Sequence, residues 1–297
     1  MNFEVSTFSA VRHNALQYIL DKRTPRQQLI DQILSLFREA FSHLRNAFDR
    51  RTRVPFTYHK CDEIPAWKPN SEGLFVFLHG FNGHPSTWMS HLGYLQSRAP
   101  RTDVLVPHIP KAGDCPLECA AQPLLKPILD YIQKNPTKPL CLVGFSNGSR
   151  IATWLEVKLR TLAPGIPIRV STIAGVHLGT PLIGLLEKAG LAKWFCSNIV
   201  REELRHLSHK TMELWAKVRE PLPLGTRRFY DFWASSEDTF VGADLSSALP
   251  LSGSSNARFH LVHGYGHTSL VPAVAAQQLY NCLSWTREIN GAPAATR

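Results

Sequence analysis

Gly144-Phe-Ser-Asn-Gly148 lies between an apolar run, Pro139-Leu-Cys-Leu-Val143, and a helical pattern from Ser149 to Leu162. The apolar run predicts a buried strand. The pentapeptide therefore places Ser146 at the turn from a strand into a helix. A Gly-x-Ser-x-Gly sequence in this position is typical of a nucleophile elbow, which exposes a serine at the carboxyl end of a parallel sheet.

Steric crowding explains why this motif has glycine at both ends. A side chain two positions before or after the serine would crowd the neighbouring elements, so glycine is expected on both sides, and the serine itself must adopt strained backbone. Its oxygen then lies over the start of a helix, which favours negative charge. The pentapeptide alone can occur by chance, and its strand–turn–helix context makes it informative.

Outward from this motif, short strands alternate with helices. Strands are expected at residues 54–59, 74–78, 103–106, 168–173, 228–234 and 258–263, and a closing helix at 271–288. A helix from Leu117 to Lys134 should be kinked or split by Pro123 and Pro127. This alternation predicts the α/β class, with a mostly parallel central sheet and helices on both faces.

The chain of 297 residues is long enough for one large domain and a modest extension. We expect a helical extension at 1–52, a main domain at 53–290 and a frayed tail at 291–297. The connection at about 181–225 is too long for a plain crossover, and it predicts a cap over the site. Its residues expected to contact substrate are Leu182, Leu185, Leu186, Trp194 and Phe195.

The extension contains an amphipathic pattern. Thr24-Pro25-Arg26-Gln27 has the form of a helix start, and apolar residues from Leu29 to Phe48 then recur at helical spacing. Several arginines occupy the other face. We expect the apolar stripe to pack on the main domain, with contact between residues 25–50 and an anionic membrane or another partner as the alternative.

The charge and the distribution of apolar residues argue against several classes of protein. The net charge of +10 is dispersed along the chain, so it predicts a basic soluble surface, and no nucleic-acid-binding motif accompanies it. No apolar run reaches the length of about 18 residues typical of a transmembrane helix, and the first ten residues lack the pattern of a secretory signal. A cytoplasmic location is expected, with peripheral membrane contact as the alternative.

The six cysteines are expected to be reduced thiols. Cys115 and Cys119 lack a second ligand pair at zinc-site spacing, so no metal site is expected. No cofactor is expected either.

A serine hydroxyl needs a base to take its proton, and the base needs an orienting acid. In a sheet of this kind the chain order is serine, acid, histidine. His267 and Asp238 follow the last two predicted strands and fit that order. The alternatives are His263 and Glu237. Asp231 lies within a strand and is expected to point away from the loop.

The developing oxyanion needs hydrogen-bond donors. One is expected from the backbone N–H of Asn147, directly after the serine, and the second from the loop His79-Gly-Phe-Asn-Gly83. In this loop Gly80 allows the turn that directs the Phe81 N–H towards substrate. His79 is expected to pack under the site rather than to take part in the reaction.

Residues from about 54 to 290 resemble an α/β-hydrolase of the serine lipase/esterase group. The motifs that carry the resemblance are Leu78-His-Gly-Phe81, Gly144-Phe-Ser-Asn-Gly148, Glu237-Asp-Thr-Phe-Val241 and Gly266-His-Thr-Ser269. Ile173-Ala-Gly-Val-His-Leu-Gly-Thr-Pro181 and Arg205-His-Leu-Ser208 are similar to the segments around the lid of lipase-like members. The chain departs from these lipases at Val176, where they often carry proline before the histidine.

The resemblance implies Ser146 as nucleophile, Asp238 and His267 as its partners, and Phe81 and Asn147 as oxyanion donors. The expected activity is hydrolysis of carboxylic esters with apolar acyl groups through an acyl-enzyme, on a small-molecule ester or lipid-like substrate. Acyl transfer or thioester hydrolysis by the same residues is one alternative. A binding protein that keeps this fold without catalysis is another.

Overall fold

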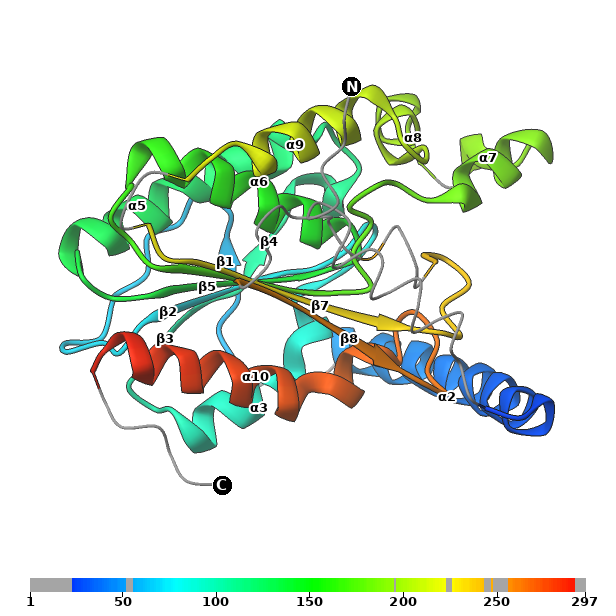
Figure 1. Ribbon diagram of the computed structural model, residues 1–297, viewed down its shortest axis with the longest axis horizontal. Coiled ribbons are helices and arrows are strands. Elements are labelled where there is room, and N and C mark those ends of the chain that lie inside the picture. Colours follow the sequence, from blue (N-terminus) through cyan, green and yellow to red (C-terminus); the bar gives the residue numbers. More distant parts are fainter. Residues whose placement is uncertain are drawn as a thin grey trace.

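The computed structural model describes residues 23–51, 56–194, 196–222, 226–242, 247 and 256–291. Its centre is a six-stranded parallel sheet in the order β3-β2-β5-β6-β7-β8. The strands are β2 (Leu74–Leu78), β3 (Asp103–Leu105), β5 (Leu140–Phe145), β6 (Ile168–Ile173), β7 (Arg228–Ser235) and β8 (Ala257–Val262). The predicted α/β class with a parallel sheet is confirmed (Figure 1).

Helices cover both faces of this sheet (Figure 1). One face carries α3 (Met89–Arg98) and α10 (Leu270–Ile289), and the other carries α4 (Leu117–Ala121), α5 (Leu125–Lys134), α6 (Asn147–Leu162) and α9 (His209–Arg219). Because side chains alternate along a strand, Leu74 and Val76 enter one core and Phe75 and Phe77 enter the other. Burial on both faces explains why these strands read as continuous apolar runs.

Two predictions about local structure had different outcomes. The strand predicted at 54–59 is wrong where it can be compared: residues 54 and 55 lie outside the described residues, and only β1 (His59–Lys60) is extended, paired with β4 (Pro107–His108) in a separate small sheet. The predicted split of the helix from Leu117 to Lys134 is confirmed, because a 3₁₀ turn (Gln122–Leu124) containing Pro123 separates α4 from α5.

The junction of β5 and α6 is sterically tight. A Cβ atom on Gly144 would lie 2.6 Å from the carbonyl oxygen of Gly148, and a Cβ on Gly148 would lie 2.0 Å from the carbonyl oxygen of Leu78. Between these glycines Ser146 has φ 53° and ψ −122°, a conformation rarely adopted by a residue with a side chain. The first turn of α6 can therefore rest against the end of β2 only because both flanking residues are glycine.

The long connection between β6 and β7 contains α7 (Pro181–Lys188), a 3₁₀ turn (Ala192–Trp194), α8 (Asn198–Leu204) and α9. Its base is closed by backbone hydrogen bonds from Thr180 N–H to the Leu204 carbonyl and from Leu207 N–H to the Leu178 carbonyl, both 2.8 Å long. In Figure 1, α7 and α8 extend beyond the carboxyl ends of the strands, on the side of the sheet that carries α6. The connection thus stands at the edge of the sheet where Ser146 lies.

Helix α2 (Pro25–Arg51) lies beside the carboxyl end of β8 (Figure 1). Our expectation that its apolar stripe packs on the main domain is wrong. The helix instead turns a row of buried or half-buried polar residues towards the rest of the structure: Gln28, Asp31, Ser35, Arg38, Glu39, Ser42 and Asn46. The apolar stripe faces outward, because the polar row finds hydrogen-bonding partners in the loop after β8.

Among the helices that the structure describes, none has the length and apolar character needed to cross a membrane. The six cysteines all carry free thiols.

A matched pair of glycine substitutions tests the junction. We expect Gly148→Ala to lower the free energy of unfolding by about 3 kcal/mol or more, since its new methyl group would collide with two backbone carbonyls at the end of β2. Gly93→Ala serves as the control: Gly93 is exposed on α3 with open space around it, and alanine there should raise the stability by about 0.5–1 kcal/mol. Urea denaturation measures both, and equal effects would contradict the steric argument.

Candidate active site

Ser146, Asp238 and His267 follow three different strands of the parallel sheet. Ser146 comes directly after β5, Asp238 lies in the turn after β7, and His267 lies in the loop after β8. Because the strands are parallel, these three connections leave the sheet at the same edge. Residues distant in the sequence are thereby gathered where ligands bind in open α/β sheets.

Asp238 and His267 are in direct contact. The Nδ1 atom of His267 lies 2.7 Å from Oδ2 of Asp238. The other carboxylate oxygen, Oδ1, accepts hydrogen bonds from the backbone N–H groups of Phe240 (2.9 Å) and Val241 (3.0 Å). These bonds fix the carboxylate plane, so Asp238 can in turn fix the orientation of the imidazole.

The imidazole of His267 lies between two aromatic rings. The ring of Phe145, the residue before Ser146, has its centroid 4.8 Å from that of the imidazole, and the ring of Phe240 has its centroid 5.2 Å away. These contacts bring His267 to the β5–α6 junction. Burial on its own lowers the pKa of His267, but the nearby carboxylates of Asp238 and Glu39 outweigh it and hold the pKa above its ordinary value.

The alternative residues are engaged elsewhere. His263 is exposed, and its Nδ1 lies 2.6 Å from the Ser236 hydroxyl. Glu237 pairs with Arg23 at 2.8 Å and accepts a hydrogen bond from the Gly264 N–H. The side chains of His263 and Glu237 therefore stabilise the loops after β7 and β8 through these contacts.

Asp231 lies within β7, as expected, and is fully buried. Its carboxylate accepts a hydrogen bond of 2.8 Å from Nε of Arg169 on the neighbouring strand β6. This ion pair ties the two strands together inside the sheet and keeps Asp231 out of the loop that carries Asp238.

The loop after β2 lies against Ser146. A Cβ atom on Gly80 would approach the Ser146 Cβ to 2.8 Å, so only glycine allows this contact. His79 is buried and holds the loop from beneath: its Nδ1 lies 3.0 Å from the Gly80 carbonyl oxygen, and the Ile109 N–H points at its Nε2 from 3.3 Å. This agrees with the packing role predicted for His79.

Asn147 is the first residue of α6, where backbone N–H groups have no partner within the helix. Its side chain is anchored by buried charges: Nη1 of Arg150 donates to the Asn147 Oδ1 at 3.3 Å, and Arg150 also pairs with Glu203 on α8 at 3.5 Å. Burial lowers the pKa of Arg150, and Glu203 opposes that effect. The start of α6 is thus connected to the long β6–β7 segment.

Glu39 on α2 is a site residue that the sequence analysis missed. Its carboxylate accepts hydrogen bonds from the backbone N–H groups of Thr268 (2.9 Å) and Ser269 (3.0 Å) and from the Thr268 hydroxyl (2.8 Å), directly after His267. Burial alone would raise the pKa of Glu39, but these hydrogen bonds outweigh it and hold the pKa below its ordinary value. The carboxylate therefore stays ionised beside His267.

The glycines around His267 make room for α2. A Cβ on Gly266 would lie 2.6 Å from Oε2 of Glu39, and one on Gly264 would lie 2.8 Å from Nη1 of Arg38. Arg38 donates a hydrogen bond of 2.5 Å to the Gly264 carbonyl and covers the Tyr265 ring at 4.4 Å. The only sequence signal of this docking was the row of polar residues opposite the apolar stripe.

The predicted substrate residues lie in the segment after β6. Leu182 and Leu186 are half-buried and Leu185 is 64% exposed, whereas the Trp194 side chain and Phe195 lie outside the described residues. The apolar cluster between this segment and the site consists of Val176, Ile183, Cys196, Val200, Leu204 and Val241, with Phe81 packed against it. Ile183, which the sequence analysis did not single out, is the α7 residue in this cluster.

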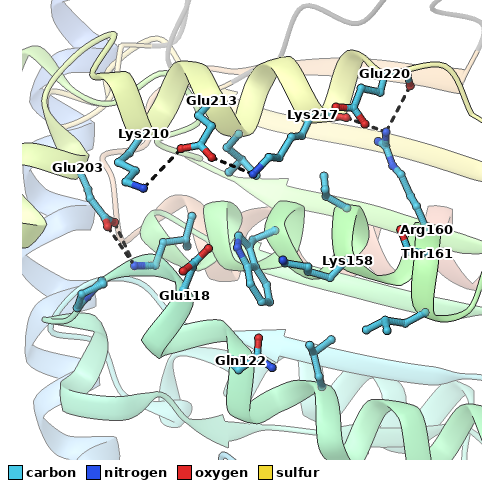
Figure 2. Close-up of a pocket in the computed structure, with 17 residues that line it drawn as sticks. Glu118, Gln122, Lys158, Arg160, Thr161, Glu203, Lys210, Glu213, Lys217 and Glu220 are labelled. Atoms are coloured by element: carbon cyan, nitrogen blue, oxygen red, sulfur yellow. Dashed lines mark hydrogen bonds and ion pairs between the residues drawn. The ribbon is translucent and has the colours of Figure 1, made fainter.

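A cavity of about 640 Å³ lies away from the candidate residues, between α4, α6 and α9 (Figure 2). Its apolar wall includes Trp154 and Leu214, and its charged rim includes a chain of ion pairs from Lys210 to Glu213 (3.5 Å) and on to Lys217 (2.9 Å). None of its lining residues is among the candidate site residues. Among the described residues no group of three or more histidine, cysteine, aspartate or glutamate side chains could hold a metal ion.

Comparisons with known proteins were made by family, by sequence and by structure. No family model matches the chain, and no curated protein matches it in sequence. Several solved structures share its fold. The mature lipase BlEst2 of Bacillus licheniformis superposes with a TM-score of 0.53 at 16% identity, over 78% of this chain and 99% of that one.

Two further structures are similar. One comes from the metagenome-derived lipolytic enzymes LipS and LipT, with a TM-score of 0.51 at 11% identity, covering 77% of this chain and 99% of that one. The other is lipase B of Aspergillus fumigatus, with a TM-score of 0.52 at 16% identity over 72% of this chain and 54% of that one. Likeness at such low identity establishes the fold alone: the chain has the α/β-hydrolase fold of these lipases and esterases.

Proposed function

We propose that this protein is a serine hydrolase that cleaves carboxylic esters of apolar acyl groups through an acyl-enzyme. The observation that carries the proposal is the 2.7 Å contact between Asp238 and His267, located at the sheet edge where Ser146 occupies its strained turn. A nucleophile, an acid and a base, in this chain order, are what acyl transfer on such a sheet requires.

In the first half of the reaction the Ser146 Oγ attacks the ester carbonyl carbon. His267 takes the hydroxyl proton on Nε2, since Asp238 accepts a hydrogen bond from Nδ1–H and so fixes the tautomer that leaves Nε2 free as a base. The bond from the carbonyl carbon to the alcohol oxygen then breaks. His267 returns its proton to the departing alcohol, and the acyl group stays on Ser146.

The tetrahedral intermediate carries its charge on the former carbonyl oxygen. We assign the backbone N–H groups of Asn147 and Phe81 as its donors. Asn147 begins α6, where the helix dipole favours negative charge, and the loop of Phe81 touches Ser146 at Gly80. Loss of one such donor typically lowers the rate by about 100- to 1,000-fold.

In the second half, water attacks the acyl-enzyme. His267 removes a proton from the water as the new carbon–oxygen bond forms, then donates it to the Ser146 oxygen as the ester bond to the enzyme breaks. The free acid leaves and the serine hydroxyl is restored. Neither half changes an oxidation state, and water is the co-reactant consumed with the ester.

The preference for apolar acyl groups is supported by the surroundings of the site. Phe145 and Phe240 flank the imidazole, and the apolar cluster around Ile183 and Val241 reaches Phe81. On α7 the exposed Leu185 and the half-buried Leu182 and Leu186 extend this lining. An acyl chain in such surroundings gains roughly 25 cal/mol for each Å² of apolar surface removed from water.

Substitution of the nucleophile tests the reaction. We expect Ser146→Ala to lower kcat for an aryl ester by about 10⁴-fold or more, and to abolish labelling by a fluorophosphonate probe, while circular dichroism and Tm stay near wild-type. Ser97→Ala, an exposed serine on α3, is the control and should keep full activity. Wild-type turnover by Ser146→Ala would refute the assignment.

Glu39 should set the pH range of the reaction. The neutral form of His267 is the base, so activity falls as the pH drops through its pKa. Because Glu39 helps to raise that pKa, Glu39→Gln should move the acid limb of kcat/KM to lower pH. Loss of the charge that accepts hydrogen bonds from Thr268 and Ser269 should also lower the free energy of unfolding by about 1 kcal/mol.

Asp31→Asn is the matched control for this prediction. Asp31 lies on the same helix but pairs with Arg23 and makes none of the hydrogen bonds after His267. Its loss should leave the acid limb in place. If the two variants shifted the limb equally, Glu39 would act only through the stability of α2.

Acyl-chain preference is tested with p-nitrophenyl esters of increasing length. The apolar lining predicts that kcat/KM for the octanoate exceeds that for the acetate by about tenfold or more. A preference for acetate would contradict the apolar-substrate part of the proposal and leave the reaction type untouched.

A further inference from the structure

The outward side of α2 is an uninterrupted apolar face, referred to below as the α2 apolar face. It consists of Leu29, Ile30, Ile33, Leu34, Leu36, Phe37, Phe41, Leu44 and Phe48. Five of these side chains, Leu36, Phe37, Phe41, Leu44 and Phe48, are 66–72% exposed. Single exposed apolar residues are ordinary on protein surfaces, but a contiguous row of them marks an interaction surface.

Within the described part of the chain, α2 docks through the side opposite to this face. The opposite side of the helix already docks on the loop after β8, through Glu39 at Thr268 and Ser269 and through Arg38 at Gly264. Ser35 and Ser42 lie on that docked side and are buried. The orientation of α2 is therefore fixed by polar contacts, and these contacts direct the apolar residues away from the core.

The charges of α2 are segregated in the same direction. Its described carboxylates are both on the docked side, where Asp31 pairs with Arg23 and Glu39 accepts hydrogen bonds from the turn before α10. Among the described side chains from Pro25 to Phe48, the exposed ones include Arg26 and Arg45 and no carboxylate. The outward side thus combines apolar and cationic groups, which complements an anionic lipid surface.

A groove beside the helix fits the same partner. A cavity of about 490 Å³ lies between α2 and the start of α10, lined by the Phe37, Phe41, Arg45, Tyr265 and Pro272 side chains among others. It places two exposed phenylalanines next to an arginine. The apolar side chains of such a groove can accept an acyl chain.

We propose that the α2 apolar face binds an anionic phospholipid bilayer, with the helix lying in the plane of the interface. Its 27 residues span about 40 Å, and its breadth and flanking arginines are those of an interfacial amphipathic helix. This proposal rests on the proposed function in one respect: a lipid-like ester would reach Ser146 from that bilayer. Figure 1 shows why it could, since α2 lies at the carboxyl end of the sheet.

Flotation with lipid vesicles tests the binding without catalysis. The full chain with Ser146→Ala is mixed with vesicles of phosphatidylcholine, or with vesicles in which about one-third of the lipid is phosphatidylglycerol. We expect the protein to float with both, and at least about tenfold more tightly with the anionic vesicles. High salt should remove that advantage, because it screens the arginines.

Two sets of substitutions separate the apolar from the ionic contribution. Phe37→Gln/Phe41→Gln/Leu44→Gln should weaken binding to both kinds of vesicle by about 100-fold or more, since glutamine keeps the helix but removes the apolar surface. Arg26→Gln/Arg45→Gln should weaken binding to anionic vesicles by about 30-fold and leave binding to neutral vesicles unchanged. The control, Ile64→Gln/Leu162→Gln, removes exposed apolar residues that are not part of α2 and should not change binding.

The outcomes distinguish this proposal from the proposed function. A soluble aryl ester reports the reaction independently, and the triple glutamine variant should hydrolyse it at the wild-type rate. A wild-type chain that hydrolyses this ester but stays at the bottom of the gradient would overturn membrane binding alone. Membrane binding would also be overturned if the wild-type chain did not float and formed a dimer in gel filtration while the triple variant was a monomer. The face would then bind a second copy of the chain.

Discussion

A steric constraint positions the site where the first turn of α6 meets the end of β2. At Gly148 the two elements approach so closely that no side chain fits between them. This contact holds Ser146 at a positive φ above the sheet and brings the loop of Gly80 against it. The serine, the start of the helix and the neighbouring loop are therefore positioned together by one steric constraint rather than by separate side-chain interactions.

The histidine is positioned by a second set of contacts, which come from outside the sheet. Asp238 fixes the imidazole from the turn after β7, and Glu39 on α2 accepts hydrogen bonds from the two backbone N–H groups that follow His267. Gly264 and Gly266 leave the space that Arg38 and Glu39 fill. A segment that precedes the sheet in sequence thus braces the loop that carries the candidate base and adds a negative charge near it.

The same contacts explain the unusual orientation of α2. Amphipathic helices usually bury their apolar side, but the Thr268 and Ser269 N–H groups and the Gly264 carbonyl offer partners that only polar side chains can satisfy. Docking through polar groups leaves the α2 apolar face outward, at the edge of the sheet where the proposed reaction takes place. The support that α2 gives to the site and the exposure of the α2 apolar face therefore both follow from the polar docking of this helix.

The sequence by itself determined the parallel α/β sheet, the strand–turn–helix around Ser146 and the chain order of Asp238 and His267. These features depend on local periodicity and on glycines that a tight turn requires for steric reasons. It could not assign Glu39, whose role depends on a contact with Thr268 more than 200 positions away in the chain. It also predicted the wrong side of α2 as buried. Periodicity identifies the two sides of a helix, but only the tertiary structure decides which side finds partners, since that depends on the groups presented by distant loops.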